Sequence, residues 1–452
     1  MAAVSMSLYN NVAGEIISKG KKRYIGRKER DMKVLFIMPG AGDSFYCGNC
    51  FRDNLQAMAL RKAGHDVIIM PLYLPLKQNV FKGDVPLFFP ATTYYVEQKM
   101  FGKHKMPLWM KRILGSEALL DMASSLSGTT SAEGMEGMTL SMIEGEGQAF
   151  KQNMKELIDW VKQTEKPDVI QLSTSLLLGI AKELKKETNI PIVCSLQDEE
   201  VWIDSLKEEF VDKAWQGVLA NAKYVDRFIT TSYYYQQIVM TKMPQLGRVE
   251  VIYPGVDVDK YQSDEYPADP TIGFFYRMNE LDGLDILADA FVLLKQRGTV
   301  PRLKLRIGGG YMNPDKKLVK QVKRTLKPYA TDVVMEETYD MDEHADFYRK
   351  ITVLSVPLRF QEGVGLYLCE AFAAGRPAVE PNTGSFAEIV GHAGLIYEPN
   401  DAQHLADALE QMLTDKPLYD SCREHAMTMA RERYNDIIAA NHLTNLYAEL
   451  HH

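Results

Sequence analysis

Cysteine is scarce in this sequence, and long apolar runs are absent. The chain of 452 residues has five cysteines, an odd and scattered set, which argues against a disulfide framework and for a reducing compartment. No apolar run approaches the roughly 18 to 20 residues that a membrane-spanning helix needs. The formal net charge of −8 gives no general attraction for nucleic acid. We therefore expect a protein of the cytoplasm that does not bind nucleic acid.

The chain is too long for a single hydrophobic core. Its 452 residues exceed the size of about 250 to 300 residues at which one core stops growing, so two domains are expected. Residues 1–32 differ from the rest, because they are basic and lack the apolar core of a secretory signal. They are interpreted as a disordered leader, or as sequence upstream of a true start at Met32. A peripheral contact with the inner face of the membrane, at about 1 kcal/mol per basic residue, is the alternative.

Strands and helices alternate from Lys33 onward. A continuous apolar run at 33–38 is followed by a glycine-bearing loop at 40–49, a helix at about 51–63 and a strand at 67–70. This order is the opening unit of a doubly wound α/β fold, in which ligands bind beyond the carboxyl ends of the strands.

Residues 74–148 interrupt the alternation with aromatic and basic clusters and a tract of small residues. An insertion of this length is usually a functional lid or a binding surface, so we expect acceptor specificity to reside here. Two interpretations stay open. The segment is either an apolar and basic patch that rests on a membrane, or a helical subdomain that packs its own aromatic residues.

Two cysteines, Cys47 and Cys50, stand in the glycine-bearing loop just before the first helix. The positive end of that helix would lower a thiol pKa, as a redox pair requires. A structural zinc is not expected, because no second cysteine pair or suitably spaced histidine completes four ligands. Local packing, or shaping of an acceptor site, is the remaining interpretation.

One stretch of the second half concentrates features suited to ligand binding. An apolar strand at 351–357 runs out into a polar loop, and a short helix follows from about Leu366 to Ala374. Gly363 and Gly365 leave the backbone bare at the start of this helix, so N–H groups can face an anion or a sugar hydroxyl. The loop is therefore a candidate trap for phosphate and hydroxyl groups.

Two glutamates flank the start of this helix. Glu362 precedes the glycines, and Glu370 lies at i+4 from Leu366, a spacing that we expect to aim both carboxylates at one cleft. Carboxylates only accept hydrogen bonds, which suits the vicinal hydroxyls of a sugar and of a ribose. Either glutamate alone is explained as well by a solvated surface position.

Together with Gly375-Arg-Pro377, Gly384 and Glu388, this Glu-x7-Glu loop and helix closely resembles the signature of the retaining glycosyltransferases of family 4. The resemblance covers about residues 33–450. It implies a GT-B fold, an α/β architecture of two doubly wound Rossmann-like domains facing across a cleft. The domains would span 33–260 and 261–435, with a last helix over 436–452 that crosses back to the first domain.

The resemblance also implies a reaction. A hexose would move from a nucleotide diphosphate sugar (a UDP-, GDP- or ADP-hexose) to a hydroxyl of a glycan or lipid-linked acceptor, with retention of anomeric configuration. No metal or other cofactor is expected, because Arg277 and the helix amides would neutralise the departing diphosphate.

Site residues follow from the same resemblance. Glu362 would touch the donor sugar, Glu370 would bind the nucleotide ribose and Arg277 would approach the diphosphate. Four consecutive residues would present amides to sugar and phosphate: Gly363, Val364, Gly365 and Leu366. Three residues of the first glycine-bearing loop would border the acceptor and the diphosphate: Gly42, Gly48 and Asn49.

The chain departs from the family pattern after the strand at 191–196, where many members carry a histidine near the donor sugar. Here the residues are Gln197 and Asp198. We expect Asp198 to orient the sugar or to draw a proton from an acceptor hydroxyl, with Gln197 as a neutral hydrogen-bonding substitute for the histidine. Capping of the following helix is the alternative for Asp198.

Asp282 is the more serious departure, because a lysine usually stands at this place, just before a glycine. An inward-pointing acid would repel a diphosphate, and loss of one preorganised contact commonly costs about 10²-fold in rate. Either Lys304 or Arg359 compensates, or donor handling is weakened. A solvated Asp282, with Arg277 acting alone, is a further alternative.

Three other functions stay open. A sugar-nucleotide sensor without turnover would explain both departures. An α-glucan synthase fits the motif, although its lysine-rich opening loop is missing. An epimerase on the same fold would need an acid and base pair that flanks the sugar, and the chain offers no distinctive one. Gly308–Gly310 would either receive nucleotide or form a tight turn.

Overall fold

The computed structural model describes residues 31–39, 48–72, 135–163, 166–263, 265–338, 343–399 and 401–451. The predicted leader, apart from its last two residues, and most of the predicted insertion lie outside these ranges. The chain divides after Met32, and all the strands and helices below belong to the unit that starts at Lys33.

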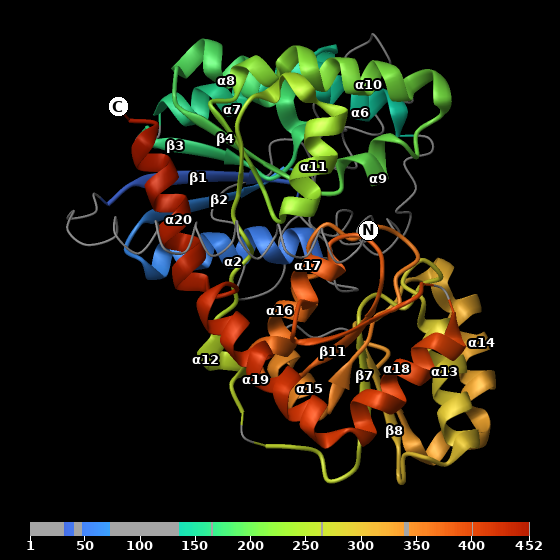
Figure 1. Ribbon diagram of the computed structural model, residues 1–452. Helices are drawn as coiled ribbons and strands as arrows, with labels where there is room; N and C mark the ends of the chain where they lie inside the picture. Colours follow the sequence, from blue (N-terminus) through green and yellow to red (C-terminus); the bar gives the residue numbers. More distant parts are fainter. Residues whose placement is uncertain are drawn as a thin grey trace. The chain divides into compact units, whose positions relative to one another are not determined.

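Six parallel strands form the first sheet (Figure 1). In spatial order they are β2 (Asp66–Pro71), β1 (Lys33–Met38), β3 (Val169–Leu172), β4 (Ile192–Leu196), β5 (Arg227–Thr230) and β6 (Val249–Val251). β3 and β4 are buried along their whole length, as expected for central strands of a sheet that helices cover on both faces. The predicted opening unit of strand, loop, helix and strand is confirmed for its described elements.

Seven α-helices are described in this half: α2 (Gly48–Lys62), α6 (Glu136–Glu144), α7 (Gln148–Gln163), α8 (Leu178–Thr188), α9 (Glu199–Ile203), α10 (Glu208–Asn221) and α11 (Tyr233–Lys242). α6 lies inside the predicted insertion, yet it packs closely on the regular helices. The Asn221 side-chain amide donates to the Ile143 carbonyl at 2.7 Å, and a β-carbon on Gly179 would lie 2.4 Å from the Met142 carbonyl oxygen. The regular packing therefore begins before residue 149, where the sequence placed it.

The second sheet also has six parallel strands. In spatial order they are β9 (Val333–Met335), β8 (Lys304–Gly308), β7 (Thr271–Phe275), β10 (Val353–Leu354), β11 (Ala378–Pro381) and β12 (Gly394–Tyr397). Numbered within this half, the order is 3-2-1-4-5-6, that of dinucleotide-binding folds. The predicted strand at 351–357 is shorter than expected, and β11 was not predicted.

Nine α-helices are described in the second half: α12 (Val258–Tyr261), α13 (Leu284–Arg297), α14 (Lys316–Leu326), α15 (His344–Arg349), α16 (Leu366–Ala373), α17 (Phe386–Val390), α18 (Ala402–Thr414), α19 (Lys416–Glu432) and α20 (Asp436–Glu449). α20 contacts the end of α2, where His65 Nε2 lies 2.8 Å from Thr444 Oγ1 and Lys62 Nζ lies 3.2 Å from Asp436 Oδ2. The domain boundaries stay predictions. None of the helices described here is long and apolar enough to cross a membrane.

α16 is buried on all its faces. It is preceded by Gly365, whose φ of 62° favours glycine, and the chain leaves it through Gly375, with φ of 68°. A helix that is apolar all round belongs in a core, and this one carries a single charged residue, Glu370. The predicted helix and its glycine stop are confirmed.

Candidate functional site

The site begins where the second sheet changes direction. β7 and β10 are neighbours, paired at Ile272 and Val353, and the chain continues from them to opposite sides of the sheet. Open α/β sheets bind ligands at the carboxyl ends of strands at such a switch point. Here Tyr276, after β7, donates a hydrogen bond from its hydroxyl to Glu362 Oε2, after β10, at 3.1 Å.

The carboxylate of Glu362 is buried and held by the backbone of its own loop. The residue is 4% exposed, and the amide of Val364 donates to Oε1 at 3.3 Å. Burial raises the pKa of Glu362, while hydrogen bonds from the amides of Val364, Gly365 and Gly363 and from Tyr276 oppose that rise. The amides that were predicted to serve sugar and phosphate therefore turn toward Glu362 in this structure.

Close backbone packing fixes the Glu362 loop in place. Gly384 has φ of 56°, and a β-carbon there would lie 2.6 Å from the Glu362 nitrogen. The Ser385 amide donates to the Glu362 carbonyl at 2.9 Å. Leu366 starts α16 and is itself buried. Gly384, part of the recognised motif, thus allows two stretches of backbone to meet.

Glu388, the last residue of that motif, binds the start of α11. Its carboxylate accepts hydrogen bonds from the amides of Tyr233 at 2.9 Å and Tyr234 at 2.8 Å. An acidic side chain is favourable at the positive end of a helix. The Tyr234 hydroxyl also donates to Gln361 Oε1 at 2.7 Å, so the loop that carries Glu362 is fastened to a helix of the first half.

Asp198 lies against the same loop from the end of β4. Its Oδ1 atom is 2.7 Å from the place that a β-carbon on Gly363 would occupy, and Ser232 Oγ donates to the Gly363 carbonyl at 2.6 Å. Burial, followed by the nearby charge of Glu362, raises the pKa of Asp198 well above its ordinary value. The structure thus brings together two of the three predicted catalytic residues.

The alternative role for Asp198, capping of the following helix, is wrong. Asp198 stands at the start of α9 with φ of 54°, but its side chain makes no capping hydrogen bond. Its buried Oδ1 atom has no hydrogen-bond partner in the described part of the chain, and the same holds for the buried Oε1 atom of Gln197. Buried acceptors without donors are rare in proteins. Hydroxyl groups of a ligand would supply the donors that both atoms lack.

Glu199 is a buried residue that the sequence reasoning missed. It accepts hydrogen bonds from the Ser175 amide at 3.0 Å, the Gln197 amide at 2.6 Å and the Tyr235 hydroxyl at 2.8 Å. This carboxylate holds the turn on which Gln197 and Asp198 sit. The signal available in the sequence was an acid three residues beyond the end of a buried strand.

Tyr235 also links Glu199 to Glu200. Its hydroxyl lies 2.8 Å from Glu199 Oε2 and 2.7 Å from Glu200 Oε2. A phenol donates one hydrogen bond, so the second contact requires a proton on one of the carboxyl groups. Burial raises the pKa of Glu200, which favours that proton.

The structure corrects the expectation that Glu370 and Glu362 face one cleft. Glu370 is fully buried, and its carboxylate accepts hydrogen bonds from the hydroxyls of Tyr261 at 2.6 Å and Tyr348 at 2.8 Å. His344 Nδ1 lies 2.9 Å from the same carboxylate. Because α16 is buried on every side, the one charged side chain on it has to find donors inside the core. Ribose binding by Glu370 stays a prediction.

Arg277 is held by an acid that the sequence did not indicate. Its Nε and Nη2 atoms donate to Asp315 at 2.9 and 3.1 Å, a two-pronged pair in which both residues are buried. Asp315 also accepts the Met312 amide at 2.9 Å, which fixes its position. A contact between Arg277 and a diphosphate stays a prediction, and the phosphate would share the guanidinium with Asp315.

Asp282 is buried, so the alternative in which it is solvated is wrong. The residue is 3% exposed, and its Oδ2 atom has no hydrogen-bond partner in the described ranges. Gly283 next to it has φ of 72°, and a β-carbon there would lie 1.9 Å from the Pro357 carbonyl oxygen, so the turn is tightly packed. Burial raises the pKa of Asp282 well above its ordinary value, and the charge of Arg277 only opposes this rise.

Neither cation proposed as a substitute for the missing lysine is placed to act as one. Lys304 starts β8, so it lies at the opposite end of the strands from Arg277, which follows the carboxyl end of β7. It pairs with Asp269 at 2.7 Å. Arg359 donates to both carboxylate oxygens of Asp285, at 2.8 and 2.7 Å. Compensation by either residue is therefore not supported by the structure.

The triple glycine packs against the strand end that leads to Arg277. Gly309 has φ of 106°, and a β-carbon there would lie 2.3 Å from the Tyr276 carbonyl oxygen. The Met278 amide donates to the Gly310 carbonyl at 2.9 Å. These contacts favour the tight turn over a nucleotide site for Gly308–Gly310.

Several predicted residues cannot be placed. Gly42 and Cys47 lie outside the described residues, and so do the side chains of Asn49 and Cys50, while Gly48 starts α2. The acceptor role of the first loop and the redox interpretation of its cysteines therefore stay predictions. No cluster of three metal-binding side chains occurs among the residues the structure describes.

Two family models match the chain, one in each half. The model described as Glycosyltransferase Family 4 matches residues 142–260, and the model described as Glycosyl transferases group 1 matches residues 269–415. The second match includes Arg277, Glu362 and Glu370, and the first includes Asp198.

Several curated proteins are similar to part of the chain. A D-inositol 3-phosphate glycosyltransferase of Corynebacterium aurimucosum is 30% identical over 227 residues, 44% of this chain and 51% of that protein. A GDP-mannose-dependent alpha-(1-6)-phosphatidylinositol monomannoside mannosyltransferase of Mycobacterium tuberculosis is 27% identical over 189 residues, 37% of this chain and 47% of that protein. The chain thus spans about half the length of these relatives.

Solved structures resemble the chain over nearly its whole length. Sucrose-phosphate synthase of Thermosynechococcus elongatus matches with a TM-score of 0.66 at 17% identity, covering 93% of this chain and 99% of that one. Anabaena HepE, solved in complex with UDP and glucose, matches with a TM-score of 0.62 at 15% identity, covering 92% of this chain and 100% of that one. At these identities the likeness concerns the fold, and the predicted GT-B architecture is confirmed.

Proposed function

The chain belongs to glycosyltransferase family 4, and from that premise we propose that it transfers a hexose from a nucleotide diphosphate sugar to an acceptor hydroxyl, with retention of anomeric configuration. One observation carries the proposal. The buried carboxylate of Glu362, at the switch point of the second sheet, belongs to the same loop that packs through Gly363 on Asp198 from the first sheet. Two carboxyl groups from separate sheets thus converge where a sugar would bind.

Glu362 and Asp198 have different roles in this proposal. Glu362 is fixed by Tyr276 and by backbone amides, so it accepts hydrogen bonds from donor sugar hydroxyls in one geometry. Asp198 keeps one oxygen without a hydrogen-bond donor, and this oxygen suits a hydroxyl of the sugar or of the acceptor. Preorganised acceptors of this kind need no rearrangement when the sugar arrives.

The transfer proceeds on one face of the sugar. The bond from the anomeric carbon to the diphosphate oxygen breaks while the acceptor oxygen bonds to the same face of that carbon. The acceptor proton passes to the departing phosphate oxygen, so protons and charge balance without a covalent enzyme intermediate. Glu362 then positions the sugar and is not a nucleophile.

Arg277 and a protonated Asp282 stabilise the negative charge that develops on the leaving diphosphate. Because burial raises the pKa of Asp282, its carboxyl group is favoured in the neutral form. A neutral carboxyl donates a hydrogen bond and does not repel an anion. Asp282 would thus replace the point charge of the usual lysine with one O–H donor.

The donor panel follows from the relatives. One of them is named as GDP-mannose-dependent, and others act on D-inositol 3-phosphate by name. GDP-mannose is therefore a donor of first interest, beside UDP- and ADP-hexoses, with a glycan or lipid-linked acceptor. Peripheral contact with a membrane belongs to the same proposal and concerns the segment 74–148.

A sugar-nucleotide sensor is the second candidate, and two observations favour it. Asp315 already occupies the guanidinium of Arg277, and a carboxyl group stands where a lysine is usual. Both features weaken stabilisation of a leaving diphosphate. The sensor predicts binding of the donor without release of nucleoside diphosphate.

Retention is tested on the product of an α-linked donor. Proton NMR of the new glycosidic linkage is expected to show the α anomer. A β anomer would contradict transfer on one face of the sugar, and Glu362→Gln serves as the inactive control.

A further inference from the structure

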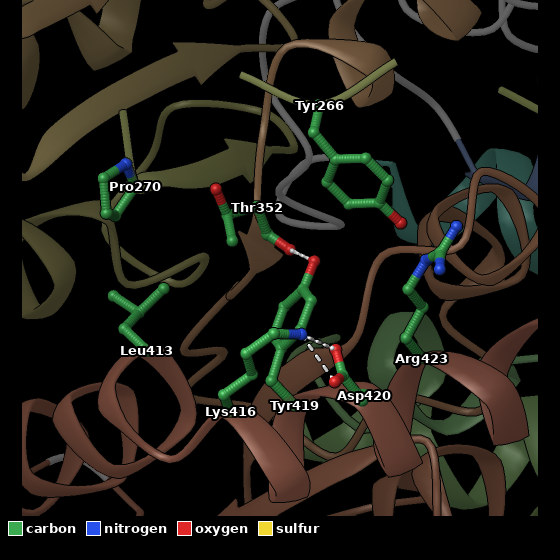
Figure 2. Close-up of a pocket in the computed structure, with 8 residues that line it drawn as sticks. All are labelled: Tyr266, Pro270, Thr352, Leu413, Lys416, Tyr419, Asp420 and Arg423. Atoms are coloured by element: carbon green, nitrogen blue, oxygen red, sulfur yellow. Dashed lines mark hydrogen bonds and ion pairs between the residues drawn. The ribbon is translucent and has the colours of Figure 1, made fainter. Parts of the chain in front are cut away.

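A pocket of about 410 Å³ lies at the amino-terminal ends of strands β7 and β10 of the second sheet (Figure 2). Pro270, in its wall, directly precedes β7, and Thr352 directly precedes β10. Glu362 instead follows β10, so the pocket and the candidate functional site lie at opposite ends of the same strands. A volume of this order is that of a small-molecule site, since ligand pockets span about 300 to 1,000 Å³.

One face of α19 forms a wall of the pocket. Four residues of the helix line it, spaced at i, i+3, i+4 and i+7: Lys416, Tyr419, Asp420 and Arg423. This spacing places them on the same side of the first two helical turns. Tyr266 and Pro270 line it from the segment that runs from α12 to β7.

The lining carries an uncompensated positive charge. Lys416 Nζ pairs with Asp420, at 2.6 and 2.8 Å, so these two residues neutralise each other. Arg423 makes no ion pair in the described part of the chain, and its buried Nε atom has no hydrogen-bond partner there. The guanidinium of Arg423 stands beside the ring of Tyr266, 4.8 Å from its centre.

A second arginine, which has no carboxylate partner among the residues that the structure describes, lies behind this wall. Arg376 is fully buried, and its guanidinium lies 4.2 Å from the centre of the Tyr266 ring. It donates to the carbonyls of Glu265, of Tyr348 at 2.9 Å and of Arg349 at 3.3 Å, while its buried Nη1 atom has no partner within the described ranges. Buried cations are normally paired with an anion, so two guanidinium groups that have no carboxylate partner in the described ranges and lie beside one tyrosine indicate a place for an anion.

We propose that this pocket binds the phosphate group of a small phosphate monoester. The planar fork of a guanidinium matches phosphate oxygens, and hydrogen bonds between charged groups are the strong ones. The pocket is larger than an inorganic ion requires, and the rings of Tyr266 and Tyr419 offer contact to a further ring on the ligand. Sugar phosphates and nucleoside monophosphates share this chemistry.

The pocket is lined in part by the segment that connects the two sheets. Tyr266 and Pro270 belong to the segment between α12 and β7, and Arg423 belongs to α19. A phosphate held by Arg423 beside Tyr266 would tie this segment to the helix. The proposal stands apart from the transfer reaction, because it needs no residue of the candidate functional site.

Calorimetric titration of the full chain tests the site with three probes: inorganic phosphate, D-mannose 6-phosphate and uridine monophosphate. We expect saturable binding of at least one ester, and the preferred ester identifies the source of the phosphate. Arg423→Gln should weaken binding about 10-fold to 100-fold, the value of a hydrogen bond between charged groups. Arg423→Lys keeps the positive charge but lacks the planar guanidinium. Its affinity for the ester should lie between those of the original chain and of Arg423→Gln.

Arg431→Gln is the matched control, because Arg431 is an exposed arginine farther along the same helix. This variant should bind the phosphate ester with the same affinity as the original chain. Equal weakening in both glutamine variants would show a general charge effect and overturn the site. Unchanged affinity in Arg423→Gln, or no saturable binding of any probe at about 10 mM, would also overturn it.

Discussion

Asp198 Oδ1 lies 2.7 Å from the position that a β-carbon on Gly363 would occupy. The loop after β10 can approach this carboxylate only because residue 363 has no side chain. Gly363 does not belong to the glycines with left-handed φ, so its backbone suits other residues. Space, and not backbone conformation, is therefore what this position requires.

Gly363→Ala is expected to lower kcat/KM about 10-fold or more, which corresponds to about 1.4 kcal/mol of transition-state stabilisation. The added methyl group has to displace Asp198 or the loop that carries Glu362. The melting temperature should change little, because the neighbouring carboxylate can move. The control is the same change in an Asp198→Ala background, where it should cause no further loss. An equal loss in that background would show that the clash with Asp198 is not the cause.

Glu370→Ala is expected to destabilise the fold by about 3 kcal/mol, measured by denaturant unfolding. Removal of this carboxylate leaves the buried hydroxyls of Tyr261 and Tyr348 without their acceptor. Glu370→Gln keeps an acceptor oxygen, so it should lose less stability than Glu370→Ala. If Glu370→Ala unfolds at the same denaturant concentration as the original chain, the buried network does not support α16.

Asp282→Asn tests whether the buried acid is neutral. Since its folded pKa is raised, the folded state binds the proton more tightly than the unfolded chain, and stability falls as the pH rises from the ordinary aspartate pKa of 3.8. The variant removes this loss. Its free energy of unfolding should therefore exceed that of the original chain at neutral pH.

The two proteins should become equally stable in acid, below the ordinary pKa of an aspartate. The rate of sugar transfer gives a second measurement. It should decline at high pH in the original chain, because Asp282 ionises beside the diphosphate. Asp282→Lys should remove this decline. A variant less stable than the original chain at every pH would contradict a raised pKa for Asp282.

The sequence predicted the fold where local signals agree with burial. The apolar runs of β1 and β7 and the glycines around α16 placed these elements within a few residues. β11 was missed because Pro377 precedes it, Pro381 ends it and Glu380 lies inside it, and prolines argue against a central strand. β10 was predicted too long because a buried apolar run need not remain paired.

The candidate site was predictable in part. Glu362 and Asp198 follow strands, so topology alone brings them to the carboxyl edges of their sheets. The direction of Glu370 was not predictable from its spacing, because Glu362 lies in a loop and helical periodicity does not apply to it. The pairing of Arg277 with Asp315 spans 38 residues, and no local pattern reports such a contact.

The most direct test is a panel of nucleotide sugars incubated with the purified chain, with binding followed by calorimetry and free nucleoside diphosphate followed in parallel. We expect one donor to release nucleoside diphosphate. Glu362→Gln should reduce this release about 10²-fold while the melting temperature is kept. Tight binding of a donor without release, even after glycan and lipid-linked acceptors are added, would contradict the transferase and favour the sensor.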